Sequence, residues 1–154
     1  MPPHLIGIIS DTHGLLRPEA LAALQGCELI LHAGDAGKPE VLDSLRHLAP
    51  LHAVRGNVDR GDWAEALPLS EVVEVDGSLL YLYHGHLALD LDPAAAGFAA
   101  VISGHSHRPS IAERGGVLYL NPGSAGPRRF SLPVTLAQLT VHQGRLEANL
   151  IELA

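Results

Sequence analysis

Short apolar runs alternate with polar, glycine-containing loops through the first half of the chain. Residues 5–9 form an apolar run typical of a buried strand, and residues 28–32 and 51–54 repeat the pattern. Between these runs, a proline suited to the first turn and helical spacing of leucines predict helices over residues 18–25 and 39–49. The order strand, helix, strand, helix, strand predicts an α/β domain.

The second half of the chain reads as mostly β. Its expected strands cover residues 71–75, 79–83, 98–102, 117–120, 134–141 and 146–153. The dipeptide Asp76-Gly77 favours a hairpin turn between the first two of them. The longer loops, residues 87–97 and 123–131, are the segments expected to move or to face a substrate.

The composition predicts one globular domain spanning residues 1–154. Apolar residues make up 47% of the chain, and no apolar run approaches the ~20 residues that a membrane-spanning helix needs. The first residues also lack the features of a secretory signal. The single cysteine, Cys27, cannot form an internal disulfide, which is typical of a reducing compartment. We therefore expect a cytoplasmic protein without a membrane partner.

The charge of the chain excludes a simple electrostatic attraction to nucleic acid. Its formal net charge is −7, so a stable nucleic-acid complex is not expected. The ten histidines equal the ten lysines and arginines in number, and histidine is the commonest protein ligand of metal ions. Two bound divalent cations would bring the charge from −7 to −3, which would help an anionic substrate to approach.

Polar side chains follow the predicted strands, where the loops of an α/β sheet form its ligand-binding rim. Asp11 and His13 point the same way if the chain stays extended past Ile9. The metal-competent side chains at such strand ends are Asp11, His13, Asp35, Asn57, His84, His105 and His107. Oxygen and nitrogen donors without thiolate favour Mn²⁺, Fe²⁺, Zn²⁺, Ni²⁺ or Co²⁺. Seven donors exceed the needs of one tetrahedral ion and suit two ions that share a carboxylate.

Each of these fragments has a simpler interpretation when taken alone. Asp11 could cap a turn, and Gly34-Asp35 and Gly56-Asn57 are common turn dipeptides. Each His-x-His pair could be half of a simple zinc site. The His-x-His-x-Asp-His signature of another metallohydrolase fold is excluded by Ala88 and Leu89. The occurrence of all the fragments in one chain favours a metal centre.

The fragments Asp-x-His-Gly, Gly-Asp, Gly-Asn-x-Asp, His-Gly-His and Gly-His-Ser-His follow one another between Ile8 and Ser124. In this order they resemble the calcineurin-like metallophosphoesterase superfamily. The chain length and the final Asn-Pro-Gly-Ser resemble its small single-domain phosphodiesterase branch. The resemblance implies a four-layer α/β/β/α sandwich of two mixed β-sheets flanked by helices.

The resemblance also implies which residues hold which ion. One metal would be held by Asp11, His13, Asp35 and His107, and the other by Asp35, Asn57, His84 and His105. Asp35 would bridge two divalent ions, Mn²⁺ in the first place, with Ni²⁺, Fe²⁺, Co²⁺ and Zn²⁺ as alternatives. The implied activity is hydrolysis of a small phosphodiester by a hydroxide that bridges the metals, with Asn57 at the catalytic centre.

One position departs from the monoesterase pattern of this superfamily. Many of its phosphomonoesterases have histidine directly after the asparagine, where it can protonate a leaving group, whereas this chain has Val58. Valine therefore favours a diesterase. His86 is the candidate for a supporting group or late proton donor. The alternatives are a phosphomonoesterase and a scaffold protein that resembles the retromer subunit of the same fold, and the oligomeric state is left open.

Overall fold

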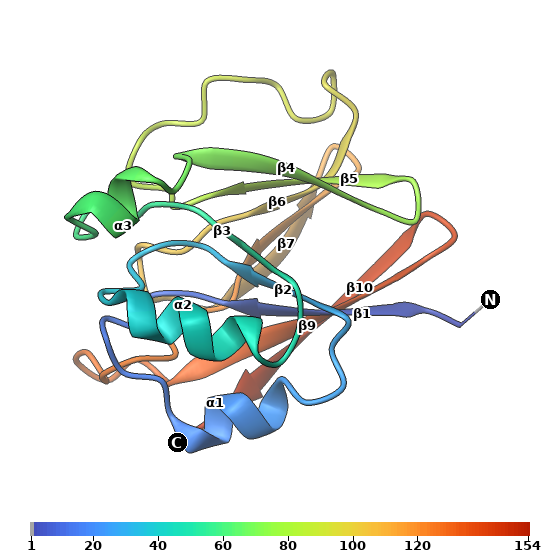
Figure 1. Ribbon diagram of the computed structural model, residues 1–154. Helices are drawn as coiled ribbons and strands as arrows, with labels where there is room; N and C mark the ends of the chain where they lie inside the picture. The colour runs from blue at the N-terminus through green and yellow to red at the C-terminus, as the bar shows by residue number, and fades with distance from the viewer. Residues whose placement is uncertain (1) are drawn as a thin grey trace.

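The computed structural model describes residues 2–154, and within them two five-stranded β-sheets pack face to face (Figure 1). The first sheet has the strand order β10-β9-β1-β2-β3, and the second has the order β4-β5-β6-β8-β7. The strands are β1 (His4–Ile9), β2 (Leu29–His32), β3 (Leu51–Ala53), β4 (Ser70–Val75), β5 (Ser78–Tyr83), β6 (Phe98–Ile102), β7 (Ser110–Arg114), β8 (Val117–Asn121), β9 (Thr135–His142) and β10 (Arg145–Glu152).

Strands β1, β2 and β3 form the parallel part of the first sheet, and β1 and β2 are buried on both faces. β1 pairs in parallel with β2 and antiparallel with β9, and β2 pairs in parallel with β3. Ile6 and Ile8 belong to the core between the two sheets, whereas Ile9 and Ile30 belong to the core beneath the helices. Burial on both faces explains why these strands read as continuous apolar runs rather than as alternating patterns.

The second sheet combines a parallel centre with antiparallel edges. β5, β6 and β8 run parallel, while β4 pairs antiparallel with β5 and β7 pairs antiparallel with β8. The predicted hairpin turn between β4 and β5 is confirmed. Asp76 and Gly77 both have positive φ angles, 49° and 81°, as a two-residue hairpin of the primed type requires.

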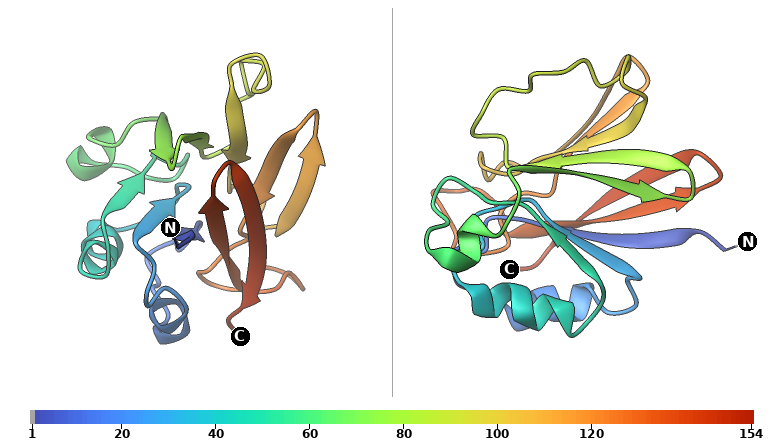
Figure 2. Two further views of the ribbon diagram at one scale, coloured as in Figure 1. Left: turned by 90° about the vertical axis from the view of Figure 1, so that its right-hand side faces the viewer. Right: turned by 45° about the horizontal axis from the view of Figure 1, so that its top comes forward.

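All helices of residues 2–154 pack on the side of the first sheet (Figures 1 and 2). They are α1 (Pro18–Ala23), α2 (Pro39–Arg46) and α3 (Asp62–Glu65). The prediction of two mixed sheets in an α/β sandwich is confirmed. The outer face of the second sheet lies beneath the long segment between β5 and β6 instead of a helix (Figure 1). No helix in the described part of the chain has the length and apolar character to span a membrane.

Two elements did not emerge from the sequence pattern. α3 has a single turn, too short for a helical period to show, and its Trp63 packs against a small apolar cluster. β7 is exposed along its whole length at the edge of the second sheet, so its residues show no alternation of apolar and polar positions. The predicted helix over residues 18–25 ends slightly earlier, at Ala23.

The parallel strands of both sheets end at the same edge of the sandwich, on the left of Figure 1. The loops after β1, β2, β3, β5, β6 and β8 therefore meet there. Such an edge is where open α/β sheets bind their ligands.

Packing between the sheets should dominate the stability of the fold. The side chain of Leu80 is fully buried between them, whereas Val72 on the outer face is 52% exposed. We expect Leu80→Ala to lower the free energy of unfolding by about 2–5 kcal/mol, because it removes buried methyl groups and leaves a cavity. Val72→Ala should cost less than about 1 kcal/mol. Urea denaturation of both variants tests this, and equal losses would contradict it.

Candidate metal centre

The loops at the strand ends bring all seven predicted donors together. Asp11, His13 and His107 form one group, and Asp35, His84 and His105 form another, with the ligand atoms of each group within 4.8 Å of one another. The amide oxygen of Asn57 joins the second group, 3.0 Å from Nε2 of His84 and 3.2 Å from Nδ1 of His105. Donors separated by up to 96 positions along the chain thus lie at one edge of the sandwich.

The backbone at these donors is left-handed, which the sequence did not lead us to expect. The residues with positive φ are Asp11 (54°), His13 (47°), Asp35 (58°), His105 (71°) and His107 (63°). The condition under which Asp11 and His13 would point the same way, an extended chain past Ile9, is therefore not met: β1 ends there and both residues are left-handed. Nε2 of His13 still lies 3.8 Å from Oδ1 of Asp11. Residues other than glycine in this conformation are typical of strained functional loops.

The buried carboxylate of Asp11 has hydrogen-bond partners for one of its oxygens and none for the other. Its Oδ2 accepts hydrogen bonds from the Ser10 hydroxyl at 2.7 Å and from the backbone N–H of His105 at 3.0 Å. Its Oδ1 has no hydrogen-bond partner. Nε2 of His107 lies 3.5 Å from that oxygen, and Nε2 of His13 lies 3.8 Å from it. A buried carboxylate oxygen that faces imidazole nitrogens is the environment a divalent cation would complete.

Asp35 lies between the two groups. Its Oδ1 accepts a hydrogen bond from the backbone N–H of Val58 at 3.0 Å. Its Oδ2 is 3.1 Å from Nε2 of His84 and 3.8 Å from Nε2 of His13, so it faces one donor from each group. Burial opposes the charge of this carboxyl, but the hydrogen bonds from His84 and Val58 lower its pKa to about 2. Asp35 is therefore ionised at neutral pH.

His84 presents a fixed nitrogen to this carboxylate. Its Nδ1 donates to the carbonyl oxygen of Ala33 at 2.8 Å, because a carbonyl can only accept. Its Nε2 consequently faces the oxygens of Asp35 and Asn57. Burial lowers the pKa of His84, but the hydrogen bond to Asp35 and the charge of Asp11 outweigh it and raise the pKa. The surroundings of Nε2 thus favour a positive charge, either a proton or a metal ion.

The imidazoles of His13 and His107 lie next to each other, and both face Oδ1 of Asp11. Their Nε2 atoms are 3.3 Å apart, and Nδ1 of His107 is buried without a hydrogen bond. Burial and the positive charge of Arg129 lower the pKa of His107 to about 4, and burial also lowers that of His13. Two neutral imidazoles can then direct lone pairs at one cation without first losing a proton.

Asp59 holds two of the donor loops together, a role that sequence reasoning missed. Its buried Oδ2 accepts the backbone N–H groups of Asp35 at 3.0 Å and Gly56 at 2.9 Å, and its Oδ1 accepts that of Gly37 at 3.0 Å. The available signal was its place at the end of the Gly-Asn-x-Asp motif. Removing this carboxylate would leave buried N–H groups of the loops after β2 and β3 unpaired.

The Asn-Pro-Gly-Ser segment after β8 supports two further loops. The hydroxyl of Ser124 donates to the carbonyl oxygen of Asp11 at 2.9 Å, and Nδ2 of Asn121 donates to that of Gly104 at 3.0 Å. Gly104 packs so closely against the Ser10 hydroxyl that a side chain would collide with it. This segment therefore fixes the backbone of two loops that carry donors.

His32 has a structural role in the core. It is buried, its Nδ1 accepts the backbone N–H of Gly34 at 3.1 Å, and its Nε2 lies 3.0 Å from the Thr12 hydroxyl. Burial lowers its pKa to about 3, so it remains neutral. His4, expected at the surface, pairs with Glu28 far along β1 from the donor loops.

The buried charge of Asp11 predicts a stability cost in the metal-free chain. Burial raises the pKa of its carboxyl from 3.8 to about 6. Because the folded pKa lies above the unfolded one, the protein loses stability as the pH rises through this interval. We expect Asp11→Asn to raise the free energy of unfolding by about 1–3 kcal/mol at pH 7 and not at pH 4. Urea denaturation in EDTA measures this, and a loss at pH 7 would contradict it.

Comparisons with known proteins agree with this geometry. A sequence profile described as "Calcineurin-like phosphoesterase superfamily domain" matches residues 5–144. A probable metallophosphoesterase from Methanothermobacter thermautotrophicus is 38% identical over 164 aligned residues, which cover 96% of this chain and 91% of the relative.

Solved structures extend the comparison. A novel archaeal phosphodiesterase is similar with a TM-score of 0.79 at 26% identity, covering 96% of this chain and 99% of its own. Vacuolar Protein Sorting 29 from Cryptosporidium parvum has the same fold, with a TM-score of 0.78 at 18% identity and coverage of 99% and 98%. The family resemblance inferred from the motifs is confirmed. The chain belongs to the calcineurin-like phosphoesterase superfamily.

Proposed function

We propose that this metallophosphoesterase is a phosphodiesterase that binds two divalent cations at its seven clustered donors. The observation that carries the proposal is the position of Asp35, whose Oδ2 faces His84 of one donor group and His13 of the other. A carboxylate between two sets of ligands is the arrangement of a bridged metal pair. Mn²⁺ is the first candidate for both positions because the donors are oxygen and imidazole nitrogen.

The residues of the centre divide the work of binding and orientation. When bound, the cations supply an acidified water and neutralise charge on the phosphoryl oxygens. Asp11 and Asp35 contribute the negative charge that holds the cations. The hydrogen bond from His84 to the carbonyl of Ala33 fixes the ring that presents Nε2. Asn57 contributes an uncharged oxygen beside His105, which leaves its amide nitrogen able to donate to a substrate oxygen.

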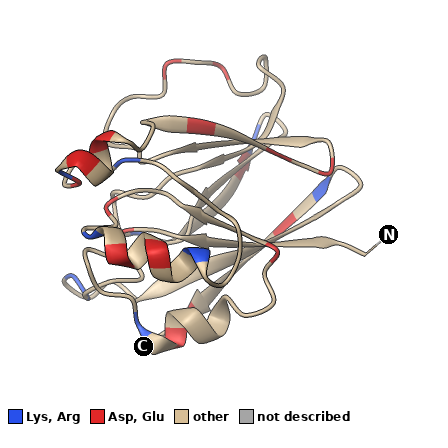
Figure 3. Ribbon diagram, viewed as in Figure 1, with Lys and Arg blue, Asp and Glu red and all other residues tan. Residues whose placement is uncertain are grey.

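Positive side chains beside the centre support an anionic substrate. Figure 3 shows Lys and Arg segments along the edge where the donor loops meet, although the chain as a whole is acidic. The charge of Arg129 lowers the pKa values of His13 and His107, and Arg55 acts in the same direction on His86. These cations would attract a phosphate group. We propose small phosphodiesters as substrates, since a long polyanion would meet the net negative charge of the whole chain.

A diester is favoured because the centre has no strong proton donor. Val58 follows Asn57, is 43% exposed and cannot transfer a proton. The ring of His86 lies 5.3 Å from that of His84, centroid to centroid. Burial and the neighbouring histidines lower the pKa of His86, so little of it carries a proton at pH 7. We therefore propose that His86 supports the ring of His84 rather than protonating a leaving group.

A scaffold function is the competing proposal. It is favoured by the likeness to Vacuolar Protein Sorting 29, which at this level of identity extends to the fold alone. The complete set of metal-competent donors favours the enzyme. Elemental analysis of the purified protein after Mn²⁺ loading separates the two, because near-zero metal would support the scaffold.

We also propose a cytoplasmic location. The single cysteine, Cys27, is buried and free, which is compatible with a reducing compartment.

The direct test is a panel of phosphomonoesters and phosphodiesters assayed with several divalent metals. We expect EDTA to abolish hydrolysis of an activated diester and Mn²⁺ to restore it. Asp35→Asn should remain folded yet lose at least about 100-fold in kcat/KM, because one shared ligand of both cations is weakened. Full activity of the metal-free protein, or of Asp35→Asn, would exclude the proposal.

Because Val58 cannot donate a proton, a histidine at this position should improve the hydrolysis of phosphomonoesters. Val58→His places an imidazole directly after Asn57, where it can protonate a leaving alcohol. We expect kcat/KM for an unactivated phosphomonoester to rise by about tenfold or more, with little change for an activated diester. Val58→Asn is the matched control, since it is polar but cannot supply the proton at neutral pH. An equal response from both variants would show that leaving-group protonation does not limit the reaction.

A further inference from the structure

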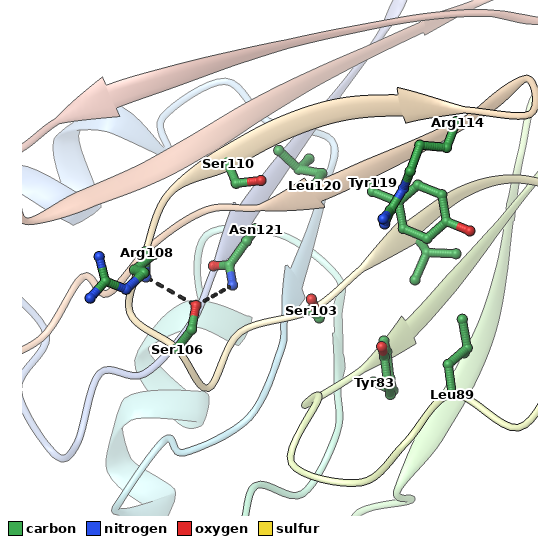
Figure 4. A pocket seen from close by; sticks show the side chains of 11 residues that line it. Tyr83, Leu89, Ser103, Ser106, Arg108, Ser110, Arg114, Tyr119, Leu120 and Asn121 are labelled. Carbon is green, nitrogen blue, oxygen red and sulfur yellow. Dashed lines mark hydrogen bonds between the residues drawn. The ribbon is translucent and has the colours of Figure 1, made fainter.

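A groove of about 650 Å³ lies on the outer face of the second sheet, beside the metal centre (Figure 4). Strands β5, β6, β7 and β8 supply most of its lining, and Leu89 from the long segment after β5 contributes to one wall. One end is formed by Ser106, Arg108 and Asn121, and the other by Arg114 and Tyr119 (Figure 4). Its volume is within the range of small-molecule sites.

The first end of the groove shares a loop with the metal centre. Ser106 lines the groove, whereas its sequence neighbours His105 and His107 each belong to one of the two donor groups. Neighbouring Cα atoms along a chain are about 3.8 Å apart, so the backbone of Ser106 lies next to that of two metal donors. A ligand that extends beyond the donors across this loop would enter the groove.

Ser106 is prepared to donate a hydrogen bond. Its Oγ accepts from Nδ2 of Asn121 at 3.2 Å and from the backbone N–H of Arg108 at 3.2 Å. Asn121 is itself fixed, because its Nδ2 also donates to the carbonyl of Gly104. With both lone pairs of Ser106 used, only its proton is left, and nothing in residues 2–154 accepts it. An anion bound at this point would accept a hydrogen bond from the Ser106 hydroxyl.

The arginines of the groove have no carboxylate partner among the described residues. Arg46 on α2, by contrast, pairs with Asp43 at 3.0 Å. The guanidinium carbon of Arg114 lies 4.0 Å from the ring centroid of Tyr119, which makes a flat cationic surface at the far end of the groove. The groove lining contains two arginines and no Asp or Glu, although the chain has 17 acidic and 10 basic residues. Such a site attracts anions.

We propose that this groove binds the part of a nucleotide diester that extends beyond the scissile phosphate. A second phosphate of the substrate binds Arg108 and the hydroxyl of Ser106. The planar base of the substrate's nucleoside stacks against the Arg114–Tyr119 pair. This assignment rests on the proposed function, in which the metal centre holds the first phosphate. It narrows the substrate class to diesters that carry a nucleoside and a further anionic group.

Two esters with the same leaving group test the assignment. They are the 4-nitrophenyl ester of thymidine 5′-phosphate and the same ester with an added 3′-phosphate. We expect the wild type to prefer the second by about tenfold in kcat/KM, and Arg108→Ala to abolish this preference. Arg145→Ala removes an equal charge at the start of β10 and should keep the preference. Equal use of both esters by the wild type would overturn the assignment.

A binding measurement separates this proposal from the proposed function. Thymidine 3′,5′-bisphosphate is titrated calorimetrically into the EDTA-treated protein, in which the metal centre cannot hold phosphate. We expect the dissociation constant to rise about tenfold in Arg108→Ala and in Arg114→Ala, and the affinity of the wild type to fall at high salt. Binding unchanged in both variants would overturn the groove assignment. Failure to hydrolyse either ester, with binding intact, would overturn the proposed function and reduce the groove to a nucleotide site.

Discussion

The structure depends on a buried carboxylate oxygen that the protein itself does not satisfy. Oδ1 of Asp11 has no hydrogen-bond partner, and imidazole nitrogens surround it. Burial of such a group is costly unless an opposite charge is close by. The nearest imidazoles, those of His107 and His13, have lowered pKa values, and no lysine or arginine among the described residues pairs with this oxygen. A divalent cation is therefore the partner for which this arrangement is suited.

Rigid strands and a few supporting side chains hold these donors in position. Parallel strands of both sheets end at one edge, so every donor loop begins from a buried and rigid strand. Left-handed residues then turn the donors inward, and Asp59 and Ser124 bind the backbone of neighbouring loops. Hydrogen bonds with Asp59 and Ser124, which are not themselves metal donors, thus offset the conformational strain at the donors.

Much of the fold and most of the donor set could be predicted from the sequence, because both depend on local signals. Buried strands give continuous apolar runs, and the glycine-bearing loops after them contain Asp35 and Asn57. The Gly-Asn-x-Asp motif marked Asp59 without indicating its role. Neither that role nor the left-handed backbone of Asp11 could be predicted, because both arise from contacts between loops distant in sequence. The groove on the second sheet was equally hidden. It depends on the positions of Arg108, shortly before β7, and of Arg114, at the end of β7, and this exposed edge strand shows no sequence pattern.

The most direct test of the shared carboxylate is anomalous diffraction from crystals of the protein grown with Mn²⁺. We expect two anomalous peaks about 3.5–4 Å apart. Oδ2 of Asp35 should lie between them, with His13 and His107 beside one peak and His84 and His105 beside the other. A single peak, or two peaks that do not share Asp35, would contradict the claim that one buried carboxylate joins a pair of cations.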